Sequence, residues 1–110
     1  MESKKLRACL GSGTGNEILR LLGSRGAMDV LCIFCCSTRA YRFTEISDMI
    51  EGLSTKTLTT RLRELEEKGV LRRTAYNEIP PRVEYSMTER GQLLANSLTP
   101  LIECIATWTP

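Results

Sequence analysis

The amino-acid sequence predicts a mainly α-helical domain with a small β-hairpin. Apolar residues recur at helical spacing through much of the first 69 residues and again near the carboxyl end. Between these regions, two short segments rich in strand-favouring residues flank a pair of prolines. A length of 110 residues is enough for one core. We therefore expect a single domain over residues 1–110, in which residues 1–14 form a flexible arm.

Two helices are expected in the amino-terminal part of the chain. Residues 16–22 place four apolar side chains at helical spacing, after three glycines that loosen the chain. Residues 27–37 are apolar on nearly every side, which a helix tolerates when other elements surround it. The second segment is therefore the expected central core helix.

A helix, a tight turn and another helix are predicted over residues 42–68. Thr44 is the expected N-cap of the first helix, and Gly52 is expected to end it. Ser54 is the expected N-cap of the second helix, whose leucines recur four and three residues apart until Gly69 supplies the stop. This order is that of a helix-turn-helix.

A hairpin and a last helix complete the predicted order. Residues 70–76 and 82–87 have the composition of strands, and the turn 77–81 joins them. Thr88 is the expected N-cap of a final helix that ends near residue 108. A helix-turn-helix followed by a hairpin is a winged helix-turn-helix, in which the second helix enters the DNA major groove and the hairpin, or wing, flanks it.

The outer face predicted for helix 54–68 is short, polar and cationic, as DNA contact requires. Lys and Arg pair with guanine acceptors, Thr methyl groups touch thymine, and hydroxyls bond phosphate oxygens. Acidic residues gather at the far end of this helix, which favours contact through its amino-terminal half. An ordinary solvated helix face is the alternative. The expected contacts are Ser54, Thr55, Lys56, Thr59, Thr60 and Arg63.

The hairpin adds cations near a tip that two prolines stiffen. Arg72 and Arg73 point to opposite faces of a regular strand, so at most one of them faces DNA. A cationic tip held by Pro80 and Pro81 would reach a neighbouring minor groove or backbone with little loss of conformational entropy. The expected wing contacts are Arg73, Asn77 and Arg82.

These motifs resemble the HxlR-type transcriptional regulators. The similarity covers residues 46–85, and above all the run LSTKTLTTRLRELEEKGVLRR at 53–73. The continuation YNEIPPRVEYSMTERG at 76–91 is similar to the wing and last helix of that family, and its Pro-Pro-Arg-Val-Glu-Tyr stretch separates the family from MarR-type winged helices. The resemblance implies a dimeric repressor or activator that binds a pseudo-palindromic operator.

The resemblance weakens toward the amino terminus, where Gly23-Ser24-Arg25-Gly26 replaces the usual Gly-Gly-Lys-Trp. Many members carry a Cys-Pro pair ahead of that glycine, and a subset use its cysteine as a redox sensor. Here Cys9 is followed by Leu10 and lies further upstream. Nearby cations at residues 4, 5 and 7 lower a thiol pKa, so Cys9 is the candidate redox residue.

Three other cysteines, at positions 32, 35 and 36, share one face of the predicted core helix. Zinc sites need four ligands, commonly from Cys and His, and the sequence has no histidine. We interpret these cysteines as small core residues and expect neither a metal nor a cofactor. The odd total of 5 cysteines favours a reducing compartment.

The last helix carries an apolar stripe with spacings of four, three, four and three residues, which is typical of helix pairing. We expect a homodimer through this helix, 88–108, with the first helix as a possible contributor. The expected interface residues are Leu94, Leu98, Leu101, Ile105 and Trp108.

The composition leaves little room for other functions. The sequence lacks histidine, a Gly-rich phosphate loop and a nucleophile-elbow motif, so an enzyme is not expected. It has no apolar run of membrane-spanning length and no apolar segment after its charged start, so a cytoplasmic protein is expected.

The expected partners are double-stranded DNA and a second copy of the chain. A winged-helix adaptor that binds proteins instead of DNA is the alternative.

Overall fold

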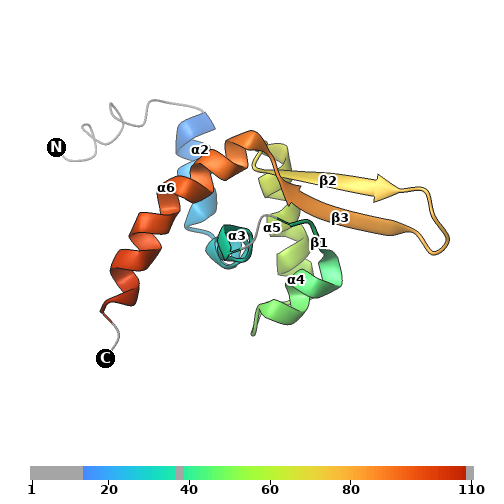
Figure 1. The fold of residues 1–110 in the computed structure, drawn as a ribbon, viewed down its shortest axis with the longest axis horizontal. Helices are drawn as coiled ribbons and strands as arrows, with labels where there is room; N and C mark the ends of the chain where they lie inside the picture. The colour runs from blue at the N-terminus through green and yellow to red at the C-terminus, as the bar shows by residue number, and fades with distance from the viewer. Residues whose placement is uncertain (1–13, 37–38, 109–110) are drawn as a thin grey trace.

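The computed structural model describes residues 14–36 and 39–108. Five helices and three strands form within these residues, and their arrangement is drawn in Figure 1. In chain order they are α2 (Thr14–Leu22), α3 (Ala27–Cys36), β1 (Tyr41–Arg42), α4 (Phe43–Met49), α5 (Thr55–Glu67), β2 (Leu71–Tyr76), β3 (Arg82–Met87) and α6 (Glu89–Ala106). The predicted helix-turn-helix, hairpin and last helix are confirmed. Because α2 begins at Thr14, the last residue of the predicted arm is helical.

The sheet contains one strand more than the sequence predicts. It is antiparallel with the order β1-β3-β2, so β3 lies in the middle. In β1, Tyr41 pairs with Tyr85 and Arg42 pairs with Glu84. A strand of two residues has no alternation to detect, and its partner lies more than 40 residues away in the sequence. The prediction of a hairpin alone was therefore incomplete.

The start of α4 also differs from the prediction, because Arg42 and not Thr44 is the N-cap. The backbone N–H of Arg42 donates to Glu45 Oε1 at 2.8 Å, which satisfies one of the amide groups left over at a helix start. Arg42 is the last residue of β1 and also immediately precedes α4. The strand therefore fixes where α4 begins.

The predicted starts of α5 and α6 and the predicted end of α5 are confirmed, whereas α4 ends at Met49 with Ile50 as its C-cap, before the expected stop at Gly52. Ser54 Oγ accepts the backbone N–H of Thr57 at 3.1 Å at the start of α5, and Thr88 Oγ1 accepts the N–H of Gly91 at 2.9 Å at the start of α6. Gly69, just after α5, has a φ of +77°. Glycine reaches this left-handed conformation without strain, which is why it ends the helix.

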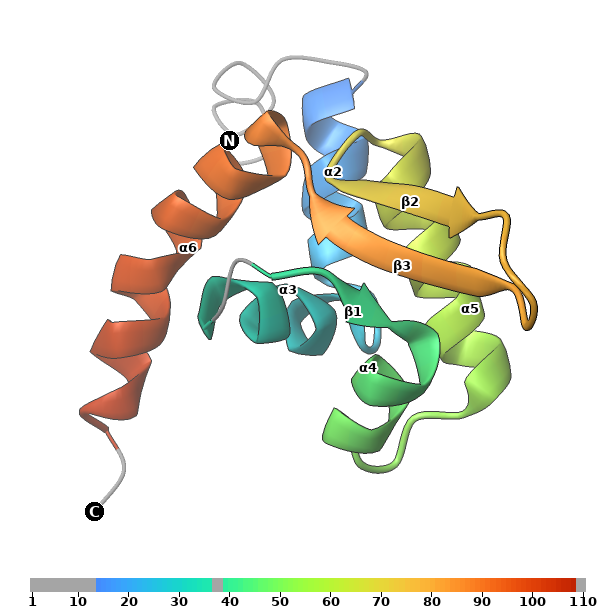
Figure 2. The same ribbon diagram turned by 45° about the vertical axis from the view of Figure 1, so that its right-hand side comes forward.

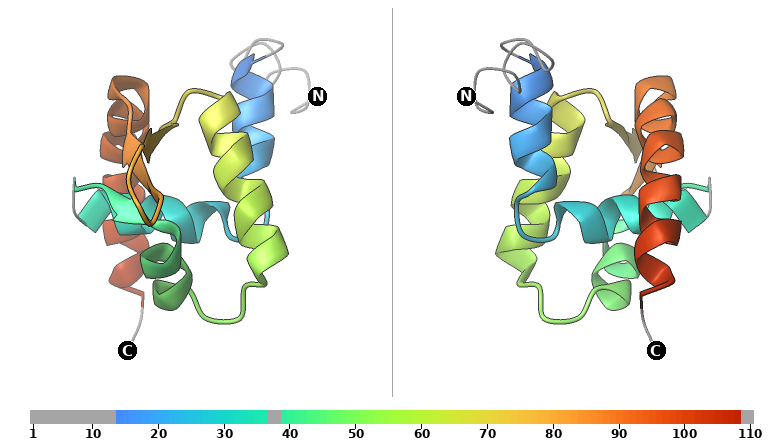
Figure 3. Two further views of the ribbon diagram at one scale, coloured as in Figure 1. Left: turned by 90° about the vertical axis from the view of Figure 1, so that its right-hand side faces the viewer. Right: turned by 90° about the vertical axis from the view of Figure 1, so that its left-hand side faces the viewer.

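The core gathers around α3, as the sequence predicts. Figure 3 shows α3 crossing between α5 and α6, and it contacts both of them. Val30, Leu31 and Phe34 of this helix are fully buried. They pack with the three leucines on the inner face of α5 and with Ile46 of α4. The core therefore fixes α5 against the body of the domain.

A close backbone contact between Gly91 and Val70 fixes the start of α6 against the residue that precedes β2. A Cβ atom added at Gly91 would lie 2.0 Å from the carbonyl oxygen of Val70, a distance that only glycine tolerates. The N–H of Thr88 also donates to this oxygen at 3.2 Å. The direction in which α6 leaves the wing is thus set at this contact.

The described residues contain neither a membrane-spanning helix nor a cluster of metal-ligating side chains. No helix within 14–36 and 39–108 combines the length and apolar character needed to cross a membrane. Over the same residues, no group of three or more His, Cys, Asp and Glu side chains is placed to hold a metal ion. Cys32 and Cys35 are partly buried on α3, and the Cys35 thiol faces the Ala95 carbonyl at 3.9 Å.

Candidate nucleic-acid interface

The two faces of α5 differ sharply. Leu58, Leu62 and Leu65 are buried, and Figure 2 shows this helix lying across the domain from α6, beside the wing. Three of the predicted contact residues toward its amino-terminal end, Thr55, Lys56 and Thr59, are exposed, and so is Arg63 one turn further on. The structure therefore places these four side chains on one outer surface, which we call the α5 face.

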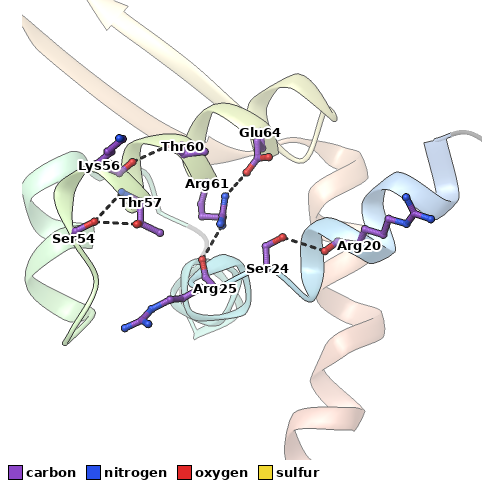
Figure 4. A network of polar contacts seen from close by, with 9 residues as sticks. All are labelled: Arg20, Ser24, Arg25, Ser54, Lys56, Thr57, Thr60, Arg61 and Glu64. Carbon is purple, nitrogen blue, oxygen red and sulfur yellow. Dashed lines mark hydrogen bonds and ion pairs between the residues drawn. The ribbon is translucent and has the colours of Figure 1, made fainter.

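Ser54 and Thr60 take part in the local structure of α5. Ser54 caps the helix and its hydroxyl also donates to Thr57 Oγ1 at 2.9 Å (Figure 4). Thr60 is half-buried, and its hydroxyl donates to the Lys56 carbonyl at 3.0 Å. Thr59 makes the same bond to the Thr55 carbonyl at 2.8 Å. These hydroxyl hydrogens are occupied, so the threonines offer methyl groups and oxygen lone pairs to a ligand.

A hollow between α5 and the wing brings two predicted cations together. Its volume is about 240 Å³, and Thr59, Arg63, Glu66, Arg73 and Tyr85 line it. Arg63 and Arg73 are both exposed, and within residues 14–36 and 39–108 neither guanidinium forms a hydrogen bond or ion pair. Glu66 is the one carboxylate in the lining. Two available guanidinium groups at the edge of a helix face suit the phosphates of a nucleic acid.

The tip of the wing differs from the cationic tip that the sequence suggested. Asn77 is exposed there. The Arg82 guanidinium carbon, however, lies 3.9 Å from the centre of the Tyr76 ring, and Arg82 Nη2 lies 3.2 Å from Glu78 Oε1. Its Nε is buried and has no hydrogen-bond partner among the described residues. Arg82 is therefore held within the wing, in what we call the Tyr76–Arg82 cluster.

A second arginine of α5, Arg61, was missed by the sequence prediction because it turns inward. Arg61 Nε donates to the Arg25 carbonyl at 2.7 Å, and its Nη1 lies 2.6 Å from Glu64 Oε1 (Figure 4). Arg25 Nη2 in turn donates to the Gly52 carbonyl at 3.0 Å. These bonds tie the turn between α2 and α3 to the helix-turn-helix. The available signal was position, since Arg61 lies three residues after one buried leucine and four before another.

Charges at the start of α4 are paired with each other. Arg39 Nη2 lies 3.1 Å from Glu45 Oε2, and its guanidinium carbon lies 3.9 Å from the centre of the Tyr41 ring. The backbone N–H of Arg42 and then the Arg39 side chain lower the pKa of Glu45 below its ordinary value. The hydrogen bond from Lys68 similarly lowers the pKa of Glu17. This ion pair joins α2 to the end of α5.

The predicted dimer stripe on α6 divides into two parts. Leu94 and Leu98 are partly buried and pack against the core of their own domain. Leu101 and Ile105, toward the end of α6, are 51% and 48% exposed, and Trp108, two residues beyond the end of the helix, is 75% exposed. This distal part of α6 runs away from the rest of the domain in Figure 1. The candidate redox residue Cys9 lies outside the described residues.

A helix-turn-helix with a polar, cationic outer face and a flanking two-stranded hairpin defines the class of winged helix-turn-helix domains. Residues 21–110 match the model of the HxlR-like helix-turn-helix family, so the chain belongs to this family. The family consists of transcriptional regulators and not of enzymes. The resemblance noted in the sequence is thereby confirmed.

Known relatives agree with this assignment. An uncharacterized HTH-type transcriptional regulator of Synechocystis sp. is 46% identical over 67 residues, which span 61% of this chain and half of that protein. The uncharacterized HTH-type transcriptional regulator YtcD of Bacillus subtilis is 32% identical over 108 residues, covering 98% of this chain and 77% of YtcD. Among solved structures, the redox regulator HypR in its oxidized form superposes with a TM-score of 0.67 and 30% identity, covering 83% of this chain and 88% of HypR.

Proposed function

We propose that this chain is a sequence-specific regulator that binds double-stranded DNA at a pseudo-palindromic operator as a homodimer. The observation that carries the proposal is the α5 face, which continues into the hollow where Arg63 and Arg73 meet. The face is polar and cationic while the opposite side of α5 is buried. Such a helix can lie in a major groove without disturbing the core.

Each side chain of the α5 face has a distinct role in this proposal. Lys56 and Arg63 donate to guanine O6 and N7 or to phosphates, and the Thr55 and Thr59 methyl groups touch thymine methyls. Arg73 contacts a phosphate from the wing side and fixes the register of the helix. Glu66 and Glu67 are exposed near the end of α5. Because these carboxylates would repel phosphates, the amino-terminal half of the helix is the part that meets DNA.

A second copy is proposed to cover the distal apolar part of α6 and Trp108, which follows the helix. About half or more of the surface of each of three large apolar side chains is exposed here, those of Leu101, Ile105 and Trp108. An exposed apolar patch at the end of a helix favours pairing with the same patch across a two-fold axis. The dimer would present two α5 faces to half-sites separated by about one turn of DNA, roughly 34–36 Å. Sedimentation of wild type and Trp108→Ala at micromolar concentration tests this, and a monomeric wild type would contradict it.

The DNA-binding proposal is tested by selecting bound sequences from a random double-stranded library and measuring affinity for the selected sites. Thr55→Ala, Lys56→Ala and Arg63→Ala should each weaken binding, and Arg63→Ala by about 1–3 kcal/mol if it contacts a base. Arg72→Ala is the matched control, because Arg72 is exposed on the opposite face of β2 from Arg73. Unchanged binding by all three variants would refute the role of α5. Failure to select any sequence would favour the adaptor alternative.

A redox input through Cys9 is a separate proposal within the cytoplasmic setting expected for a regulator. It draws on the cations that precede this cysteine in the sequence and on the similarity to the redox regulator HypR. Operator affinity of wild type and Cys9→Ser should diverge after mild oxidation. Equal responses of the two proteins would remove the proposal and leave DNA binding untouched.

A further inference from the structure

The most exposed large apolar side chain in the described part of the molecule lies at the tip of the wing. Ile79 is 101% exposed, which means that its whole side chain is in water, and Pro80 and Pro81 beside it are also exposed. Figure 1 shows the wing projecting past α5, with the loop between β2 and β3 at its far end. The wing, which is expected to contact DNA outside the major groove, therefore ends in an exposed apolar side chain.

The charges around this point cancel. Between Tyr76 and Arg82 the sequence holds one acidic residue, Glu78, and one basic residue, Arg82. These two pair with each other at 3.2 Å, and the Arg82 guanidinium also stacks on Tyr76. The tip therefore offers no available cation to phosphates, and attraction to the DNA backbone cannot be its contribution to binding.

The same contacts restrict the backbone on either side of Ile79. Tyr76 and Arg82 are the last paired residues of β2 and β3. The N–H of Glu78 donates to the Tyr76 carbonyl at 2.9 Å, which turns the chain immediately beyond the strand. Proline at the next two positions after Ile79 restricts the backbone further. A backbone restricted in this way loses little conformational freedom when the tip becomes buried in a partner.

We infer that Ile79 is an apolar wedge that enters the DNA minor groove beside each half-site and reads the presence or absence of the guanine 2-amino group. This inference rests on the proposed function. Minor-groove proteins use isoleucine and proline as apolar wedges that part neighbouring base pairs and bend the duplex. The minor groove is about 6 Å wide and distinguishes A·T from G·C mainly by that amino group. An isoleucine at the groove floor is therefore obstructed by guanine and accommodated at A·T pairs.

Affinity for a selected operator gives the first test, with wild type, Ile79→Ala and Leu93→Ala compared at several salt concentrations. Leu93 is the matched control because it is also an exposed leucine-sized side chain, at 68%, but lies on α6. Ile79→Ala should bind about tenfold more weakly, which is about 1.4 kcal/mol, with the same dependence of log K on log salt as wild type. Leu93→Ala should bind as wild type does. Circular dichroism melts confirm that both variants fold.

Modified bases give the second test by changing the minor groove alone. Hydroxyl-radical footprinting first locates the base pairs under the wing. Replacing adenine there with 2,6-diaminopurine adds the amino group, and replacing guanine with inosine removes it. Wild type should lose affinity on the first change and gain it on the second, whereas Ile79→Ala should respond to neither.

The outcomes separate the inference from the function on which it rests. If wild type binds no selected DNA, the proposed function fails and the inference fails with it. If wild type binds but Ile79→Ala matches it in affinity and in its response to both modified bases, only the wedge is overturned. A weaker Ile79→Ala that still responds to the amino group as wild type does also overturns it, because the contact would then lie outside the minor groove.

Discussion

The α5 face and the wing tip hold their cations in opposite ways. On the α5 face, Arg63 is exposed and no described residue forms an ion pair with it. At the wing tip, Arg82 is enclosed by an aromatic ring and a carboxylate. The two regions carry the same residue type, but only the first presents its charge to a ligand. The partners within reach of a side chain, and not the residue type alone, decide which arginines are available to DNA.

The largest expected effect separates the two faces of α5 itself. Leu62 is 1% exposed within the core, so Leu62→Ala should lower the free energy of unfolding by about 2–5 kcal/mol through lost burial and a residual cavity. Thr59→Ala on the outer face should change it by under about 0.5 kcal/mol. Urea denaturation of both variants measures the difference, and equal losses would mean that the two faces are not as distinct as the structure has them.

The next effect compares Arg61 with Arg63 on the same helix. Arg61→Ala removes the bonds to the Arg25 carbonyl and Glu64 and should reduce stability by roughly 1.5–3 kcal/mol, the range for hydrogen bonds to charged groups. Arg63→Ala should leave stability nearly unchanged and weaken DNA binding instead. Thermal melts and operator titrations of both variants check this crossing pattern. A binding defect without a stability defect in Arg61→Ala would assign it to the α5 face.

A smaller effect compares the two wing arginines, Arg73 and Arg82. Arg73→Ala should reduce the slope of log K against log salt by about one, because a phosphate contact is lost. Arg82→Ala should leave the slope unchanged and lower stability by about 0.5–1 kcal/mol, since it removes a partly exposed cation–π contact. Binding titrations from low to moderate salt distinguish them. A reduced slope for Arg82→Ala would place Arg82 on the DNA backbone.

The smallest effect concerns the paired charges at the start of α4. The pKa of Glu45 is lowered in the folded protein by the Arg42 backbone N–H and by Arg39. Its stabilising contribution is therefore present above the pKa of the unfolded chain and is lost as the pH falls through the folded pKa, in a window of roughly pH 5 to pH 3. The melting temperature of Glu45→Gln should lie slightly below wild type at pH 7 and approach it at pH 3.5. A difference in melting temperature that stays constant from pH 7 to pH 3.5 would contradict this prediction.

Local signals explain what the sequence could predict. Ser54, Thr88 and Gly69 act within three residues of the helix ends they define, so their roles are visible in the order of residues. The inner leucines of α5 follow from spacing alone, and the outer face follows as their complement. These features account for the helix-turn-helix and for the α5 face.

Features that depend on distant partners could not be predicted in the same way. The N-cap at Arg42 depends on β1, which exists because Tyr41 pairs with Tyr85. Leu94 and Leu98 belong to the periodic stripe of α6, yet only the folded chain shows that they pack on their own core. The contact between Arg82 and Tyr76 could have been predicted more easily, because a five-residue turn places the two residues opposite each other.

The contact at Gly91 has a geometric consequence for an operator. Helix α6 has 18 residues and is about 27 Å long at 1.5 Å per residue, with most of that length beyond Gly91. A tilt of about 10° at its base would displace its far end by roughly 5 Å over that length. In the proposed dimer, α6 is a lever whose pivot is one glycine against one carbonyl oxygen. The distance between the two α5 faces of that dimer, and so the operator spacing that would fit them, would depend on the packing at Gly91, which lies outside the α5 face.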